Sequence, residues 1–182
     1  MSKQVRITDV SPRDGLQNEP IVIPAERKVR LIELLSRTGV DEIEVTSFVS
    51  PKWVPQLADA EEVAEAVESA YSANTVFSAL VPNARGLERV LSINETAGFP
   101  LISKVSVFTA ASETFSQRNT NASIAETIQR FKPVVESARA SNLDLRGYIS
   151  CAVACPFEGA IRPTQVRAVA QQLSALGIGE ID

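Results

Sequence analysis

The stretch DEIEVTS, residues 41–47, alternates apolar and polar side chains along a predicted β-strand. Ile43 and Val45 point to one face of that strand and the polar residues between them to the other, because successive side chains in a strand alternate. The same alternation recurs in SKVSVF (103–108) and LRGYIS (145–150). A doubly wound sheet, covered by helices on both faces, favours continuously apolar strands. One apolar face opposite a mixed, charged face instead favours a closed barrel with a polar lumen.

Strand-like and helix-like segments alternate along the whole chain. Strands are predicted to begin near Val5, Glu42, Thr75, Ser103, Asp144 and Gly179. Helices are predicted over Pro24–Thr38, Ala58–Ala70, Asn83–Ile93, Ser123–Ser141 and Pro163–Leu176. Each unit takes roughly 30–40 residues, which is typical of parallel strands joined by crossover helices.

These patterns predict an α/β fold, the (β/α)8 TIM barrel, with an open doubly wound sheet as the alternative. The G-x-G-x-x-G fingerprint of dinucleotide-binding sheets does not follow the first strand. A complete barrel takes about 250 residues, whereas the chain has 182. We therefore expect the first five βα units and the start of strand 6, forming one incomplete catalytic domain over residues 1–182.

Composition excludes several classes of partner. The net charge is −4 and no stretch concentrates lysine and arginine on one face, so we expect no nucleic-acid partner. No apolar run approaches the roughly 18 residues of a membrane helix, and the start of the chain lacks the apolar core of a signal peptide. We predict a soluble, cytoplasmic protein that does not bind membranes.

The chain has two cysteines, Cys151 and Cys155, in a C-x3-C spacing. Two thiols cannot complete a structural zinc site, which takes four ligands, and the chain contains no histidine. Ordinary small residues at a strand end are the favoured interpretation, with redox or metal chemistry as the alternative.

Polar residues cluster after the first and second predicted strands. The segment SPRDGLQNEP (11–20) is long for a connection inside a βα unit. Because Arg13 and Asp14 follow the first strand, we expect them at its carboxyl end, where barrel active sites are built. Glu44 and Tyr148 reach the same face from their own strands. In an arginine beside two carboxylates, one carboxylate can bind a divalent cation and the guanidinium can stabilise an oxyanion. A structural Arg–Glu pair that plugs the barrel end is the alternative.

Four segments carry a resemblance to a known family. They are DVSPRDGLQNE (9–19), IEVTSFVSPKWVPQ (43–56), FTAASETFSQRNTN (108–121) and RGYISCAVACPFEG (146–159). In them the chain resembles the 3-hydroxy-3-methylglutaryl-CoA lyases, members of the metal-dependent lyase barrels (the DRE-TIM group) that also include isopropylmalate and homocitrate synthases. The Arg-Asp-Gly core is shared by that whole group, whereas the run SFVSPKWVPQ is specific to the lyase branch.

The resemblance implies a reaction, a cofactor and a set of site residues. The reaction is retro-Claisen cleavage of 3-hydroxy-3-methylglutaryl-CoA to acetoacetate and acetyl-CoA, a step of leucine degradation and ketone-body formation. The implied cofactor is Mg2+ or Mn2+, with Asp14 as its carboxylate ligand. Arg13, which would stabilise the enolate, and Glu44 are implied as catalytic. The implied substrate-binding residues are Arg13, Gln17, Ser47 and Tyr148.

The chain departs from the family pattern in what it lacks. The family's further metal ligands are an H-x-H pair of histidines and an asparagine, and this chain has no histidine. In the family, the L-G-D-T segment and the cysteine of the glycine-rich loop come after the position that matches residue 182. Asp182 itself stands where the family often has serine. Cys151 and Cys155 therefore do not match the loop cysteine. The remaining metal ligands are expected from a missing carboxyl-terminal part.

Two other interpretations of the activity stay open. One is a related Claisen-type acyltransferase synthase, which the SFVSPKW run disfavours, and the other is a non-catalytic fragment. The expected partners are an acyl-CoA substrate and, in the complete protein, a second copy in a homodimer. Lys52, Asn83 and Arg118 are generic candidates for CoA contacts.

Overall fold

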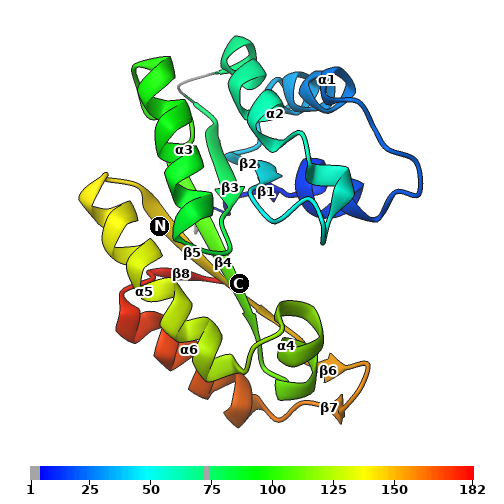
Figure 1. Cartoon of the computed structure of the whole chain (residues 1–182), viewed down its shortest axis with the longest axis vertical. Helices are drawn as coiled ribbons and strands as arrows, with labels where there is room; N and C mark the ends of the chain where they lie inside the picture. The colour runs from blue at the N-terminus through cyan, green and yellow to red at the C-terminus, as the bar shows by residue number, and fades with distance from the viewer. Residues whose placement is uncertain (1–4, 72–73) are drawn as a thin grey trace. The chain divides into compact units, whose positions relative to one another are not determined.

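The computed structural model describes residues 5–71 and 74–182 (Figure 1). These residues form two compact units, one comprising the chain up to Val81 with Arg85–Lys104, and the other Pro82–Ala84 with Val105–Asp182. Both units consist of strands followed by helices. The expectation of one catalytic domain over residues 1–182 stays a prediction.

The first unit holds three parallel strands. They are β1 (Thr8–Asp9), β2 (Glu42–Ser47) and β3 (Val76–Leu80), neighbours in that order. Its helices are α1 (Ala25–Ser36), α2 (Ala60–Ala66) and all but the first residue of α3 (Ala84–Ala97). Its short helical segments are the π-helix η1 (Ser11–Gly15) and the 3-10 helices η2 (Leu16–Asn18), η3 (Pro55–Leu57) and η4 (Val67–Ala70).

The second unit continues the same alternation. Its main strands, neighbours in this order, are β4 (Lys104–Ala110, without its first residue), β5 (Asp144–Ser150) and β8 (Glu180–Ile181). Strands β5 and β8 are parallel, with Arg146 opposite Glu180. The helices are α4 (Glu113–Thr120), α5 (Ile124–Ala140) and α6 (Pro163–Leu176), and β6 (Ala154–Cys155) pairs with β7 (Gly159–Ala160) in a small antiparallel hairpin.

Local sequence signals explain several helix ends. Ser123 accepts a hydrogen bond from the Glu126 N–H, and the Glu126 side chain accepts one from the Ser123 N–H in return, so a capping box begins α5. Pro163 occupies the first turn of α6, and Gly177 ends that helix in the left-handed conformation at φ +89°. Pro24 instead lies one residue before α1, as its N-cap.

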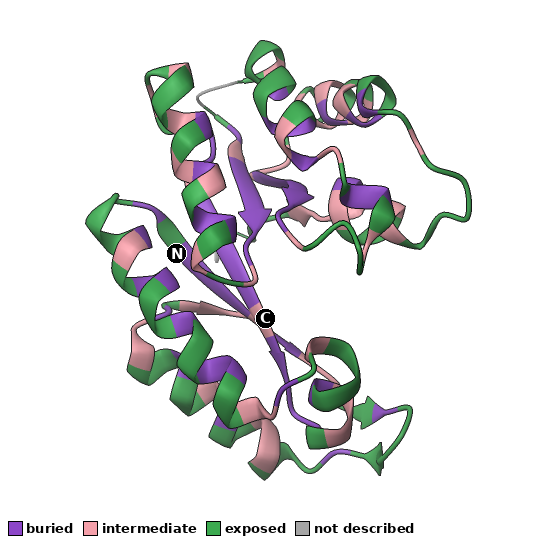
Figure 2. Ribbon diagram, in the orientation of Figure 1, coloured by how far each residue is buried: buried purple, intermediate pink, exposed green. Residues whose placement is uncertain are grey.

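The strands lie at the centre of the buried core of each unit. All six residues of β2 are buried, and the helices expose one side and bury the other, as Figure 2 shows. Ile43 and Val45 of β2 are almost completely buried, as is Ile32 of α1, which packs on this strand through its inner face. Burial of this apolar face holds helix and strand together.

The structure confirms five strand–helix units and a sixth strand among the described residues, with several local differences from prediction. Strand β1 begins at Thr8 rather than near Val5, and Val5 and Ile7 are exposed. The stretch after β1 is helical rather than an open loop, and α4 and the β6–β7 hairpin were not predicted. No helix in the described part of the chain is long and apolar enough to cross a membrane.

Candidate active site

A one-turn π-helix, η1, sets the direction of the segment that carries Arg13 and Asp14. The carboxylate of Asp9, the last residue of β1, accepts hydrogen bonds from the N–H and the hydroxyl of Ser11 at 2.9 and 2.6 Å. This local turn and Pro12 in the first helical turn favour immediate entry into a helix. The Asp14 N–H then donates to the Val10 carbonyl at 2.7 Å. Short π-helical turns are frequent at functional sites.

Arg13 and Glu44 form an ion pair in which the carboxylate is fully buried. The Nε of Arg13 donates to Oε1 of Glu44 at 2.8 Å, and the Glu44 side chain is 0% exposed. The strand register explains this ion pair. Asp9, the last residue of β1, lies opposite Ile43, so the segment that follows β1 starts close to Glu44, the next residue of β2. The expectation that Arg13 and Glu44 meet at the carboxyl ends of the first two strands is confirmed.

Asp14 lies on the other side of the Arg13 guanidinium. Its Oδ1 accepts from Nη1 of Arg13 and from Nε2 of Gln17, each at 2.7 Å. The Asp14 side chain is 53% exposed, and its Oδ2 has no hydrogen-bond partner among the described residues. Four of the predicted site residues, Arg13, Asp14, Gln17 and Glu44, thus form one hydrogen-bonded cluster.

Ser47 ends β2, three residues after Glu44, and is buried. Its hydroxyl lacks a hydrogen-bond partner in the part of the chain that the structure describes. The pairing of β2 with β3 shifts register between Glu44 and Thr46. Such irregularities re-aim side chains next to functional sites. Here Glu44 lies opposite Ser78 and Ser47 opposite Leu80, two residues apart on β3, so the shift brings the carboxylate and the serine to the same face of the sheet.

Tyr148 belongs to the other unit, on β5. Its hydroxyl accepts from Nη1 of the buried Arg146 at 3.3 Å, and the Arg146 guanidinium carbon lies 5.7 Å from the Tyr148 ring centroid. Arg146 Nε also lies 3.0 Å from the Asp182 carboxylate. The structure therefore gives Tyr148 a cationic neighbour, Arg146, within its own unit.

The carboxylate of Asp14 is a possible ligand of a divalent cation. Carboxylate oxygens are the ligands that Mg2+ and Mn2+ prefer, and the carboxylate of Asp14, whose side chain is half-exposed, fits as one such ligand. The described residues contain no group of three or more His, Cys, Asp and Glu side chains able to hold a metal. Among the described residues the candidate site therefore offers one carboxylate ligand, Asp14, rather than a complete set.

The two cysteines lie after β5, in the second unit. Cys155 is buried, and its Sγ lies 3.0 Å from the Ser112 hydroxyl and accepts from the Phe157 N–H at 3.4 Å. Cys151 adopts a left-handed conformation at φ +61°. Burial, followed by the hydrogen bond to Cys155, raises the pKa of the Cys151 thiol to about 11. A thiol so hard to ionise is a poor nucleophile, which agrees with the favoured interpretation of an unreactive residue.

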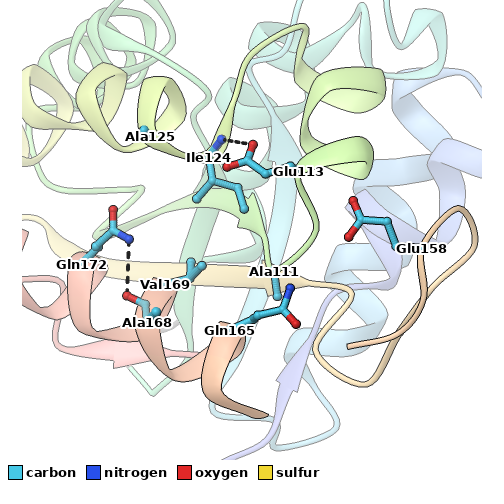
Figure 3. Close-up of a pocket in the computed structure, with 9 residues that line it drawn as sticks. All are labelled: Ala111, Glu113, Ile124, Ala125, Glu158, Gln165, Ala168, Val169 and Gln172. Atoms are coloured by element: carbon cyan, nitrogen blue, oxygen red, sulfur yellow. Dashed lines mark hydrogen bonds between the residues drawn. The ribbon is translucent and has the colours of Figure 1, made fainter. Parts of the chain in front are cut away.

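A pocket of about 310 Å³ opens elsewhere in the second unit, near the starts of α5 and α6 (Figure 3). Its two carboxylates are already engaged. Glu113 accepts from the Ile124 N–H at 3.0 Å, and Glu158 accepts from the Thr114 N–H at 2.7 Å, a bond that holds the pKa of Glu158 below its usual value. No predicted site residue lines this pocket. Of the generic CoA candidates, Arg118 stacks on the Phe157 ring, with 4.1 Å to its centroid.

Two contributors to the site escaped sequence analysis. Asp9 shapes η1, and the spacing Asp9-x-Ser11 is the signal that could have revealed it, because aspartate readily bonds the backbone two residues on. Gln56 holds the loop that follows η2. Its long-range contacts leave no local sequence signal.

Comparison with known proteins gives consistent matches. The HMGL-like family model matches residues 4–182. The chain is 44% identical over 181 residues to mouse mitochondrial hydroxymethylglutaryl-CoA lyase, covering 100% of this chain and 53% of that protein. It is 45% identical over 181 residues to 3-hydroxy-3-isohexenylglutaryl-CoA/hydroxy-methylglutaryl-CoA lyase from Pseudomonas aeruginosa, covering 100% of this chain and 57% of that protein. The chain thus spans about half the length of the curated relatives it matches.

A solved structure extends the likeness to three dimensions. The HMG-CoA lyase from Brucella melitensis aligns with a TM-score of 0.89 and 43% identity, covering 97% of this chain and 59% of that one. This likeness confirms the predicted fold class, a (β/α)8 barrel of which the chain supplies the first five βα units and the start of strand 6. Similar proteins carry both mitochondrial and cytoplasmic names, the latter including one from rat.

Proposed function

Because the chain belongs to the HMGL-like family, we propose that the complete protein is a carbon–carbon lyase that cleaves 3-hydroxy-3-methylglutaryl-CoA to acetoacetate and acetyl-CoA. The observation that carries the proposal is the Arg13 guanidinium, held between the buried Glu44 carboxylate and the half-exposed Asp14 carboxylate. The matched relatives, which are named as lyases of this substrate, support the same reaction.

In this proposal Arg13 acts on the charge that develops during cleavage. When the carbon–carbon bond breaks, its electron pair moves into the acetyl-CoA half, and negative charge accumulates on the thioester oxygen of the resulting enolate. A guanidinium fixed in place by Glu44 donates to that oxygen without having to reorganise. One donor of this kind is worth roughly 3–4 kcal/mol of transition-state stabilisation.

The other site residues bind and orient. Gln17 holds the Asp14 carboxylate in place, and Asp14 would be one ligand of Mg2+ or Mn2+. When bound, such an ion eases loss of the proton from the tertiary hydroxyl of the substrate. Ser47, with its unsatisfied buried hydroxyl, and Tyr148 complete the proposed substrate-binding set. The proposal also includes a homodimer, a cytoplasmic location and a place in leucine degradation and ketone-body formation.

The test is an assay of the complete protein with Mg2+ and 3-hydroxy-3-methylglutaryl-CoA, in which acetoacetate and acetyl-CoA are both quantified. We expect equimolar products from the wild type. Arg13→Gln should lower kcat by roughly 100- to 1,000-fold, because it removes the donor to the enolate oxygen. Arg30→Gln is the matched control, since Arg30 is an exposed arginine paired with Glu33 on α1.

Circular dichroism must show that both arginine variants are folded at the assay temperature. Absence of either product from the wild type, or normal kcat in Arg13→Gln, contradicts the proposal.

A further inference from the structure

Gln56, in η3, uses its whole carboxamide to hold one loop. Its Oε1 accepts from the Ile23 N–H at 2.8 Å, and its Nε2 donates to the carbonyls of Ile21 and Glu19 at 2.8 and 3.3 Å. The side chain is 5% exposed. Oxygen faces a donor and nitrogen faces two acceptors, so one orientation of the amide satisfies all three bonds.

The loop held in this way has no regular structure of its own. Residues 19–24 lie between η2 and α1, outside any helix or strand, and Ile21 and Val22 expose most of their side chains. Little apolar burial therefore fixes these residues. Three hydrogen bonds to a buried side chain supply the order that packing does not.

The backbone of Gln56 is itself held in place by Lys28. The buried Lys28 ammonium, on α1, donates to the Gln56 backbone carbonyl and to both carboxylate oxygens of Asp59, at 2.7 and 2.8 Å. Lys28 thereby ties η3 and the start of α2 to α1. The Gln56 carboxamide accordingly starts from a fixed backbone.

The tethered loop continues directly from the candidate site. Gln17 lies in η2, which packs against η3, and Glu19 follows η2 immediately. The Gln17 amide in turn bonds Asp14, and Asp14 bonds Arg13. A displacement of the loop therefore also displaces the side chains of Asp14 and Arg13, through Gln17.

We propose that Gln56 is a positioning residue, whose carboxamide fixes the loop 19–23 and through it the geometry of Arg13, Asp14 and Gln17. This inference rests on the proposed function of the Arg13 cluster. It couples the connection after β2 to the catalytic segment after β1.

The experiment compares two equal chemical changes in the complete protein. Gln56→Glu turns a carboxamide into a carboxylate that cannot donate to the carbonyls of Ile21 and Glu19. Asn94→Asp makes the same change at α3, where the Asn94 side chain donates to and accepts from the backbone of Ile102, each at 2.9 Å. Asn94 lies outside the site and serves as the matched control.

We expect both variants to lower the melting temperature and only Gln56→Glu to disturb the site. Its kcat should fall roughly 10- to 100-fold with little change in KM, because small misplacements of catalytic groups are costly. Its affinity for Mn2+, measured by electron paramagnetic resonance, should fall with it. Thermolysin should cleave before Ile21 or Val22 about tenfold faster than in wild type, because the loop opens more often.

Unchanged kcat, Mn2+ affinity and cleavage rate in folded Gln56→Glu overturn the proposal, as do equal losses in Asn94→Asp. If the wild type releases no acetoacetate, the proposed function fails. The Mn2+ and thermolysin comparisons then decide the role of Gln56 without reference to activity.

Discussion

Arg13 has two carboxylate neighbours in very different surroundings. The Glu44 side chain is completely buried and that of Asp14 is 53% exposed. A buried carboxylate is costly to leave unpaired, so Glu44 binds Arg13 firmly and fixes its orientation. Asp14 keeps one oxygen available toward solvent. This division assigns orientation to one carboxylate and ligand binding to the other.

Separate variants should distinguish these two roles. Asp14→Ala in the complete protein should weaken Mn2+ binding, because it removes a carboxylate ligand, whereas Arg13→Gln should leave Mn2+ affinity nearly unchanged and lower kcat. Mn2+ titration followed by electron paramagnetic resonance gives both affinities. Asp144→Ala, at an exposed aspartate that begins β5, is the control. Equal Mn2+ affinity in Asp14→Ala and wild type would show that Asp14 is not a ligand.

Cys151 should react slowly with alkylating reagents in the native protein. Only the thiolate reacts, and a pKa of about 11 leaves far less of it at pH 7.5 than an ordinary thiol has. We expect alkylation by iodoacetamide to be about 100-fold slower than in the urea-unfolded chain, and to accelerate as the pH rises toward 11. Peptide mass spectrometry distinguishes Cys151 from Cys155. A native rate equal to the unfolded rate at pH 7.5 would refute the raised pKa.

For single residues, the sequence predicts correctly where strand alternation determines the face to which a side chain points. Alternation in β2 placed Glu44 on the polar face, and from there it reaches Arg13. The exposure of Asp14 and the contacts of Gln56 were not predictable in this way. Both depend on the path of the chain between residues 11 and 24, which is set by the Asp9 carboxylate that bonds Ser11 and by the long-range amide of Gln56.

Among the helices, α5 carries an internal proline. Pro133 is exposed in the middle of Ile124–Ala140 and cannot donate to the carbonyl of Gln129. Pro133→Ala should raise the free energy of unfolding by about 1–2 kcal/mol, because the restored hydrogen bond outweighs the greater entropy of the unfolded chain. Urea denaturation measures the change. Lys132→Ala, at the exposed neighbour, should have a much smaller effect, and a destabilised Pro133→Ala would contradict the argument.

Elements with strong periodicity or clear end signals were predicted well. The range of α6, Pro163–Leu176, agrees with the structure, because proline begins it and glycine follows it. Helix α4 was missed because ETFSQRNT is mostly polar and shows no apolar stripe. It is held instead by the Ser112 cap and by Ser116, which donates to the Ala122 carbonyl at 2.8 Å.

For the whole molecule, the outer strands determine how the 182-residue chain should behave alone. Strands β1 and β8 each pair with a single strand within the described residues, so each presents an unpaired edge. We predict that this chain, expressed alone, self-associates and releases no acetoacetate in the presence of Mg2+ or Mn2+. Sedimentation velocity and the lyase assay test this, with the complete protein as control. A monodisperse, active monomer would refute the prediction.

The Arg13–Glu44 ion pair also bears on the order of events during protein synthesis. The pair and its neighbours Asp14 and Gln17 come from residues 13–44, and β1 and β2 are joined in parallel over the same stretch. Because a chain leaves the ribosome amino end first, every residue of this charged cluster has been made before β4 is translated. Glu44 can thus orient the Arg13 guanidinium before the later strands have been synthesised.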